Sequence, residues 1–212
     1  MKAKIRQSLL KTGAWYPLME MRSVPQILSW IAGGSLSPPP HAVKMRTIRA
    51  YLRRFSIAHF LETGTYFGDT LEYIAGTGVE CTSIELSEDL FAAAKLRVQH
   101  YNNVTLILGD SSLYLPTYLQ TLDDAALFWL DGHYSGGVTA RGEVSTPISI
   151  ELQSILEHRV ATHVILIDDA RLFDGSDDYP LLEDLLQTIR GSGKYEVEIS
   201  TDIIRLTPKY AS

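Results

Sequence analysis

The sequence predicts an α/β protein: a doubly wound, mostly parallel sheet of seven strands with an antiparallel hairpin at its carboxyl end, plus a helical amino-terminal extension. From Ile57 onward, short apolar segments rich in β-formers alternate with helix-like segments. Short connections between them favour a parallel sheet covered by helices on both faces. The last two apolar segments, 195–200 and 203–206, lack room for a crossover helix between them. They must therefore pair as an antiparallel hairpin.

The amino-terminal extension comprises residues 1–56. Short apolar clusters before residue 36 predict two or three short helices, separated by Gly13, Pro17 and Pro25. Consecutive prolines within 33–40 predict a loop, because they remove amide donors and keep the backbone extended. Apolar residues at helical spacing between Val43 and Phe55, among basic residues, predict an amphipathic helix that leads into the first strand.

The remaining residues, 57–212, form the predicted α/β domain. The five parallel strands are expected at about 57–62, 80–85, 105–108, 127–130 and 164–167. The intervening helices are expected to begin near Gly68, Ser87 and Ser111 and to cover about 146–158 and 179–190. At 212 residues with 45% hydrophobic content, the chain is long enough for one well-buried domain with an appendage.

The charge of the chain is divided unevenly. Residues 1–58 carry ten Lys or Arg against one acid, Glu20, and thus a charge of +9. Because the whole chain has a net charge of −6, the remaining residues carry −15. A basic arm of this kind can bind an anionic substrate, an acidic partner or a membrane surface. It can also dock on the acidic body of its own subunit or of a neighbour in a homo-oligomer. Nucleic acid is not expected as a partner, because the body is acidic and no basic-aromatic pattern recurs.

The single cysteine, Cys81, opens an apolar run and is expected to be a buried, inert thiol. One cysteine cannot form an internal disulfide, which fits a reducing cytoplasm. No apolar stretch approaches the roughly 18 residues of a membrane span, and the amino terminus lacks a signal-peptide core. We therefore expect a soluble cytoplasmic protein.

The segment Phe60–Thr70 indicates a nucleoside-bearing cofactor. Gly64 and Gly68 allow the backbone to bend tightly and approach a ligand, and the following helix directs its first amides to the same place. Glu62, at the strand end, has a carboxylate that can accept hydrogen bonds. A dinucleotide loop needs the spacing G-x-G-x-x-G, whereas Tyr66 stands here where many such loops have their middle glycine. The spacing therefore favours a cofactor without a diphosphate.

Two further strand ends supply acids. Glu85 follows Glu62 by 23 positions, where an acid can take both ribose hydroxyls, although it could also be a solvated strand-end residue. Asp110 and Ser111 follow the third strand. Either can cap the next helix, and that role is compatible with ligand binding.

These motifs and the terminal hairpin resemble the Rossmann-like class I S-adenosylmethionine-dependent methyltransferases over residues 57–208. The Glu-x-Gly-Thr-Tyr-x-Gly wording is most similar to O-methyltransferases of the catechol and caffeoyl-coenzyme A type. The resemblance implies that Asp110 and Ser111 meet the adenine. The cofactor-binding residues it implies in full are Glu62, Gly64, Thr65, Tyr66, Gly68, Glu85, Asp110, Ser111 and Asp131.

Asp131, Asp168 and Asp169 end the fourth and fifth strands and converge at one edge of the sheet. Unpaired, three carboxylates would repel one another, and a divalent cation is the simplest way to hold them. Hard oxygen ligands with open positions suit Mg²⁺. The Mg²⁺-dependent O-methyltransferases, including those that act on macrolide sugars, have acids at these strand ends, and the resemblance thus implies a metal site here.

Residues after Asp131 would complete the reaction site. His133 could act as general base with Asp131, bind the substrate, or merely hold the loop backbone. Tyr134 stands where catechol-type enzymes have a catalytic lysine. The glycine-rich segment 132–143 is expected to form a lid or substrate loop with Tyr134, Arg141 and Glu143 as polar contacts, or else a plain surface loop.

The function predicted from these features is S-adenosylmethionine-dependent methyl transfer, metal-assisted and directed to the oxygen of a small hydroxylated molecule such as a sugar or a phenol. A metal lowers the pKa of a bound hydroxyl and fixes its direction. One alternative is a metal-independent enzyme or a binding module without chemistry. An NAD-dependent oxidoreductase would share Glu85 but does not fit the glycine spacing or the hairpin.

Overall fold

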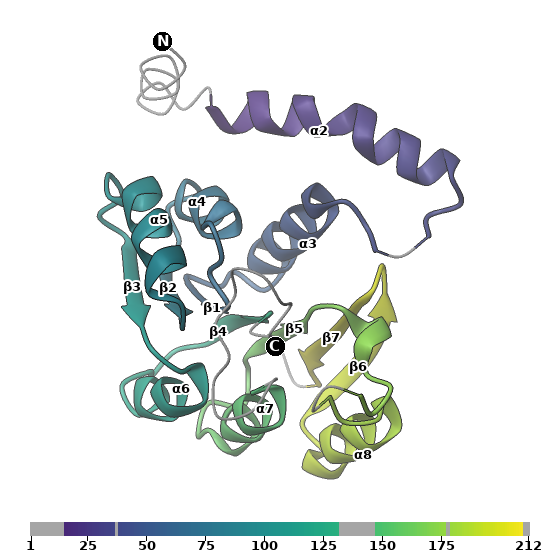
Figure 1. The fold of residues 1–212 in the computed structure, drawn as a ribbon. Coiled ribbons are helices and arrows are strands. Elements are labelled where there is room, and N and C mark those ends of the chain that lie inside the picture. Colours follow the sequence, from purple (N-terminus) through teal and green to yellow (C-terminus); the bar gives the residue numbers. More distant parts are fainter. Residues whose placement is uncertain (1–14, 37, 132–146, 177–178, 210–212) are drawn as a thin grey trace.

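The computed structural model describes residues 15–36, 38–131, 147–176 and 179–209. A seven-stranded sheet with the order β3-β2-β1-β4-β5-β7-β6 forms its centre (Figure 1). Strands β1 to β5 pair in parallel, and β7 runs antiparallel to both β5 and β6. The strands are β1 (His59–Thr63), β2 (Glu80–Glu85), β3 (Val104–Leu108), β4 (Ala126–Leu130), β5 (Val164–Ile167), β6 (Tyr195–Ser200) and β7 (Ile203–Pro208). The predicted fold class and terminal hairpin are confirmed.

Helices cover both faces of the sheet (Figure 1). One face carries α3 (His41–Arg54), α4 (Asp69–Ala75) and α5 (Glu88–Val98); the other carries α6 (Ser111–Leu119), α7 (Ile148–Glu157) and α8 (Leu182–Ser192). Neighbouring residues of one strand serve opposite faces: Phe60 belongs to the core beneath α3 and α4, whereas Leu61 belongs to the core beneath α6 and α7. The central strands β1, β4 and β5 are therefore buried on both sides, whereas the edge strands β3 and β6 are largely half-buried or exposed.

The first described helix, α2 (Trp15–Ala32), corrects the prediction of several short helices. It is one continuous helix of 18 residues that contains both Pro17 and Pro25. A proline in the first turn loses no helical hydrogen bond, and an interior proline removes only one, so a helix can continue through it with a kink. Within the described ranges, no helix has the length and apolar character needed to cross a membrane.

The second helix of the extension, α3, is part of the main core rather than a separate layer. Ile48, Tyr51 and Leu52 are buried with residues of α4 and of the sheet. The predicted amphipathic helix is thus present, and its apolar side packs on the body. This packing fixes the first turns of α3 over the carboxyl ends of the central strands.

Candidate active site

The carboxyl ends of the parallel strands meet at one edge of the sheet, where ligands bind in open α/β folds. Main-chain hydrogen bonds hold the segments after the strands side by side. Gly64 donates to the Ile84 carbonyl at 3.0 Å, and Asp131 donates to the Thr63 carbonyl at 3.2 Å. Asp168 likewise donates to the Leu130 carbonyl at 3.0 Å. The predicted site residues of β1, β2, β4 and β5 therefore lie on one continuous edge.

The loop after β1 makes the tight turn that its glycines predict. Gly64 and Gly68 have φ of 81° and 75°, in the left-handed region that glycine adopts without strain. A Cβ on Gly68 would come within 3.3 Å of the Ala94 Cβ, so the loop also packs closely on α5. Tyr66 has a positive φ of 53°, and its ring meets Phe67 edge to face on the exposed side of the loop.

Glu62 supports this loop from beneath. Only 1% of the residue is exposed, and its carboxyl accepts a hydrogen bond from the Ser83 hydroxyl at 2.7 Å. The Ser83 and Thr65 hydroxyls lie 2.6 Å apart and extend the chain of contacts to the loop. Burial raises the pKa of Glu62 well above its usual range, with the Asp131 and Glu85 charges acting in the same direction.

Glu85 connects β2 to the same loop through both carboxylate oxygens. Oε2 accepts from the Tyr66 amide at 2.8 Å, and Oε1 accepts from the Ser87 amide at 2.9 Å. A carboxylate oxygen has two lone pairs, so each oxygen can still accept a hydrogen bond from a ligand. Asp110 caps α6, since Oδ1 accepts from the Ser112 amide at 2.9 Å. The capping role considered for Asp110 is therefore present.

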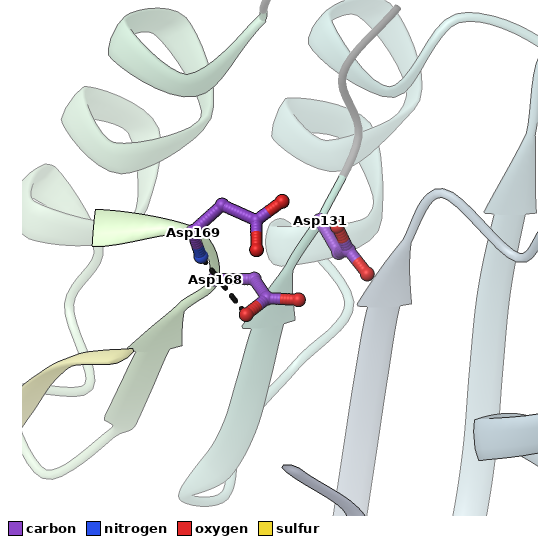
Figure 2. Close-up of side chains that lie close together, drawn as sticks. All are labelled: Asp131, Asp168 and Asp169. Atoms are coloured by element: carbon purple, nitrogen blue, oxygen red, sulfur yellow. Dashed lines mark hydrogen bonds between the residues drawn. The ribbon is translucent and has the colours of Figure 1, made fainter. Parts of the chain in front are cut away.

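Asp131, Asp168 and Asp169 come together as the sequence indicates (Figure 2). Each offers a carboxylate oxygen, and these three oxygens lie within 4.8 Å of one another. Asp168 and Asp169 are buried, and Asp131 is half-buried. Asp169 has a φ of 53°, and its amide donates to Oδ1 of Asp168 at 2.9 Å. The two adjacent carboxylates thus converge at the end of β5.

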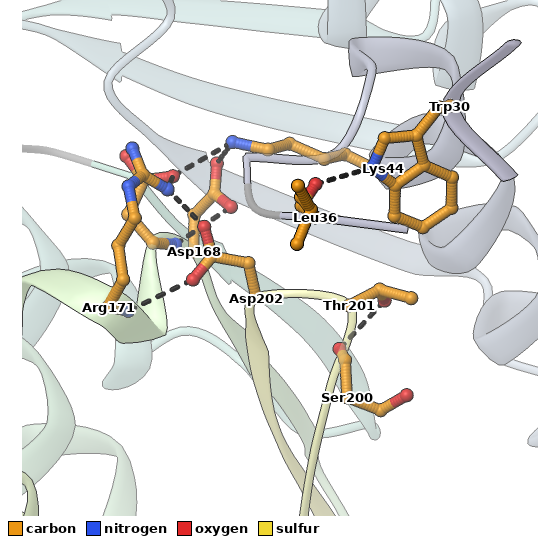
Figure 3. Close-up of polar contacts among 9 residues, drawn as sticks. Trp30, Leu36, Lys44, Asp168, Arg171, Ser200, Thr201 and Asp202 are labelled. Carbon is orange, nitrogen blue, oxygen red and sulfur yellow. Dashed lines mark hydrogen bonds and ion pairs between the residues drawn. The ribbon is translucent and has the colours of Figure 1, made fainter. Parts of the chain in front are cut away.

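Lys44 of α3 contacts this cluster. The sequence predicted the cluster but not this contact. Its Nζ lies 2.5 Å from Oδ2 of Asp168 and 3.0 Å from Oδ1 of Asp169 (Figure 3). Arg171 donates to the same Asp169 oxygen at 2.8 Å and also pairs with Asp202. A signal for Lys44 existed in the sequence, because helical spacing places it on the same face of α3 as Ile48 and Leu52. A lysine among buried apolar positions needs a buried partner.

The charges around the two adjacent aspartates act on them differently. Burial, reinforced by the Asp131 and Asp169 charges, raises the pKa of Asp168 well above its usual range. Burial also acts to raise the pKa of Asp169, but Lys44 and Arg171 outweigh it and the pKa of Asp169 is lowered. Asp169 is therefore the carboxylate that stays ionised most readily.

Two other residues in the site were not predicted. His41, one turn before Lys44, is exposed at the start of α3 and lies 3.3 Å from the Thr70 hydroxyl; partial desolvation of its ring lowers its pKa against the attraction of Asp69 and Asp131. Glu151, in the first turn of α7, is 1% exposed, and Oε2 accepts from the Thr63 hydroxyl at 3.4 Å. Oε1 of Glu151 has no hydrogen-bond partner among the described residues.

The Glu151 carboxyl keeps its proton to a higher pH than an ordinary glutamic acid does. Burial raises its pKa to about 7, although the nearby Ser111 and Thr63 hydroxyls act in the opposite direction. The predicted loop residues His133, Tyr134, Arg141 and Glu143 lie outside the described residues. The described site therefore consists of the strand ends, the first turns of α6 and α7, and α3.

Comparisons with known proteins identify the fold. No protein-family model matches the chain, and no curated protein matches its sequence. Solved structures do match. A methyltransferase of Podospora anserina, PaMTH1, bound to SAH, is 19% identical, with a TM-score of 0.58 over 80% of this chain and 82% of that one.

Two O-methyltransferases are similar to the same degree. The Bacillus cereus enzyme in complex with SAH is 12% identical, with a TM-score of 0.59 over 88% of this chain and 90% of its own. TomG of Streptomyces achromogenes, from tomaymycin synthesis and in complex with SAM, is 16% identical, with a TM-score of 0.55 over 79% of each chain. The chain has the class I S-adenosylmethionine-dependent methyltransferase fold. Several of the similar structures are O-methyltransferases.

Proposed function

We propose that the protein is an S-adenosylmethionine-dependent methyltransferase that methylates a hydroxyl oxygen of a small molecule, such as a sugar or a phenol. One observation carries the proposal: the glycine loop after β1 and Glu85 lie on the same sheet edge as Asp131, Asp168 and Asp169. A methyl donor at the first group would face an acceptor at the second. Bound SAM or SAH in three similar structures supports this choice of cofactor.

The cofactor would lie over the loop of residues 64–68. Glu85 would accept hydrogen bonds from the ribose hydroxyls through the lone pairs that its two main-chain partners leave open. Gly64 would allow the methionine end to approach the backbone, because it has no side chain there. Asp110 and Ser111, at the start of α6, would border the adenine. The sequence predicts the same role for Glu85, and the family resemblance implies the same role for Asp110 and Ser111.

We call the three aspartates the acceptor half of the site, and the glycine loop with Glu85, Asp110 and Ser111 the cofactor half. The ligand atoms of the acceptor half are compatible with a divalent cation. Asp131, Asp168 and Asp169 offer hard oxygen ligands close enough to share one ion, and Mg²⁺ prefers such ligands. A bound Mg²⁺ would lower the pKa of the acceptor hydroxyl and fix its orientation. The Lys44 ammonium would have to leave the Asp168–Asp169 pair before an ion could bind both carboxylates.

During transfer, the acceptor oxygen forms a bond to the methyl carbon as the carbon–sulfur bond breaks, and the hydroxyl proton passes to a base. Asp131 is the least buried carboxylate of the three and is the described residue best placed to receive that proton. Neighbouring groups that hold donor and acceptor in line would supply much of the rate enhancement.

Titration calorimetry with S-adenosylmethionine and NAD tests the cofactor, and a methyl-transfer screen of sugars and phenols tests the acceptor. We expect binding of S-adenosylmethionine that weakens in Glu85→Ala, no binding of NAD, and transfer to at least one hydroxylated acceptor. Binding of NAD without S-adenosylmethionine would overturn the proposal. Cofactor binding without transfer to any acceptor would favour a binding module.

A further inference from the structure

We infer that Lys44 is a built-in counter-cation of the Asp168–Asp169 pair, and that it competes directly with a divalent metal ion for these carboxylates. The inference deepens the proposed function, because it concerns the same acceptor half of the site. It assigns to α3, in the amino-terminal extension, control over whether that half can hold a metal.

The position of Lys44 is fixed by the fold rather than by a loose surface contact. Ile48 and Leu52, one and two turns further along the same face of α3, are buried in the core. The Lys44 side chain is 14% exposed, and its partner Asp168 is 1% exposed. Both charges are thus largely removed from water. Salt screens an ion pair least in such a buried position.

The ammonium and a metal ion would need the same place. Nζ of Lys44 lies between Oδ2 of Asp168 and Oδ1 of Asp169, at 2.5 and 3.0 Å (Figure 3). A Mg²⁺ ion binds carboxylate oxygens at about 2.1 Å, so an ion shared by both aspartates would lie within a few ångströms of the ammonium. Two cations at that separation repel each other strongly in a buried site. Occupation by one therefore opposes occupation by the other.

Of the two basic side chains that contact the pair in the described part of the chain, Lys44 is the one that can leave. Arg171 is also held by Asp202, which pairs with its guanidinium and accepts from its main-chain amide at 3.0 Å. Among the described residues, the hydrogen bonds of Lys44 go to Asp168 and Asp169 alone. A lysine stem is flexible, so Nζ can withdraw while α3 stays in place. Metal binding would displace Lys44 and leave Arg171 on Asp169.

A purely structural ion pair would look similar in the structure but would behave differently. Removal of Lys44 would then lower stability and leave metal affinity unchanged or weaker. Competition predicts the opposite change in metal affinity. The two roles are separated by a binding measurement that needs neither the cofactor nor an acceptor.

The experiment is a titration of the full chain with Mn²⁺, a probe for the Mg²⁺ site, followed by calorimetry and by electron paramagnetic resonance of free Mn²⁺. The variants are Lys44→Met, Lys44→Gln, Lys44→Arg and the control Lys95→Met, whose ammonium lies over the Phe91 ring on α5. We expect Lys44→Met and Lys44→Gln to bind one Mn²⁺ at least about tenfold more tightly than the wild type. Lys44→Arg and Lys95→Met should bind like the wild type.

A second substitution locates the ion. Adding Asp168→Asn to Lys44→Met should abolish the gained affinity. The inference is overturned if neither Lys44→Met nor Lys44→Gln binds Mn²⁺ more tightly than the wild type, including the case in which no variant binds it. Such a result would leave the proposed methyl transfer standing, because binding of S-adenosylmethionine and transfer are measured separately. Conversely, tighter Mn²⁺ binding without methyl transfer would support the role of Lys44 and reject the function.

Discussion

The two halves of the sheet edge are assembled in different ways. In the cofactor half, the contacts join residues close in sequence: Glu62 with Ser83, and Tyr66 with Glu85, are 21 and 19 positions apart. In the acceptor half, Lys44 and Asp168 are 124 positions apart. The glycine loop and Glu85 of the cofactor half thus lie within one β-α-β unit, and Asp110 and Ser111 follow the next strand. The acceptor half needs the amino-terminal extension, β5 and the terminal hairpin to meet.

This difference predicts that the two halves can be damaged separately. Substitutions in the cofactor half should weaken binding of the cofactor and leave the aspartate cluster intact. Substitutions in the acceptor half should do the reverse. Distant, independent sites have nearly additive effects, whereas residues in contact do not.

The largest effect is expected for Asp131→Asn, which keeps the shape of the side chain and removes its charge and basicity. Loss of a positioned proton acceptor should lower kcat by about 10²–10⁴-fold. The affinity for S-adenosylmethionine should change little if the halves are independent. Steady-state kinetics and calorimetry measure the two quantities. Asp123→Asn, at an exposed aspartate paired with Arg159, is the matched control and should retain activity.

The next effect concerns Glu85→Ala in the cofactor half. The substitution removes the acceptor for two main-chain amides and for the ribose, and charged hydrogen bonds are worth about 1.5–3 kcal/mol each. We expect S-adenosylmethionine to bind at least about tenfold more weakly, measured by calorimetry. Mn²⁺ affinity in the Lys44→Met background should not change. A parallel loss of metal affinity would show that the two halves are coupled.

An effect on stability rather than on binding is expected for Glu151→Gln, at the junction between α7 and the end of β1. Because the pKa of Glu151 is raised to about 7, the folded chain retains a proton that the unfolded chain has released. The stability it contributes is present below about pH 4.5 and is lost as the pH rises through 7, by up to about 3 kcal/mol. Denaturant unfolding from pH 5 to pH 8 should show the wild type losing stability relative to Glu151→Gln.

Only the difference between these two proteins isolates Glu151. His163, at the opposite end of the sheet, acts with the other sign, because burial lowers its pKa to about 4. Its contribution is lost as the pH falls from about 6.5 through 4. The two contributions oppose each other over part of the range, so the wild-type profile alone would hide both. A difference that is flat with pH would contradict the assignment to Glu151.

The smallest effect compares two glycines with similar backbone angles. Gly68→Ala and Gly78→Ala both place a side chain at positive φ, which costs about 1 kcal/mol. Only at Gly68 would the new Cβ meet a neighbour, Ala94 Cβ at 3.3 Å, since nothing lies within 4 Å at Gly78. We expect the free energy of unfolding of Gly68→Ala, measured in urea, to be lower than that of Gly78→Ala by a few tenths of a kcal/mol. Gly68→Ala should also bind the cofactor more weakly. Equal stabilities would show that the loop does not depend on this close packing.

The sequence predicted the parts of the molecule that depend on local patterns. Most of the parallel strands are short, largely apolar runs, and the observed bounds of all five fall within about two residues of those expected. Gly64 and Gly68 revealed the turn because only glycine adopts their angles cheaply. The convergence of Asp131 with Asp168 followed from the rule that parallel strands end at the same edge.

Contacts that depend on tertiary packing could not be predicted in the same way. Helical spacing indicates the buried face of α3 on which Lys44 lies, but the partners of Lys44 and His41 depend on the position of α3 over the strand ends, which no local pattern specifies. Glu151 lies on the buried side of α7, where its neighbours come from β1 and α6. The helix α2 shows that a local pattern can also mislead. Proline usually ends or kinks a helix, yet α2 continues through Pro25.

Asp202, in the turn between β6 and β7, gives this hairpin a second role. It is buried, accepts from the Arg171 amide at 3.0 Å and pairs with the Arg171 guanidinium, which in turn contacts Asp169. Its carbonyl also accepts from the Ala170 amide at 2.9 Å. A chimera that received its hairpin from another protein of this fold could keep the pairing of β7 with β5 and still misplace Asp169. Exchange of this hairpin between proteins of the fold therefore requires an acid at the turn as well as two compatible strands.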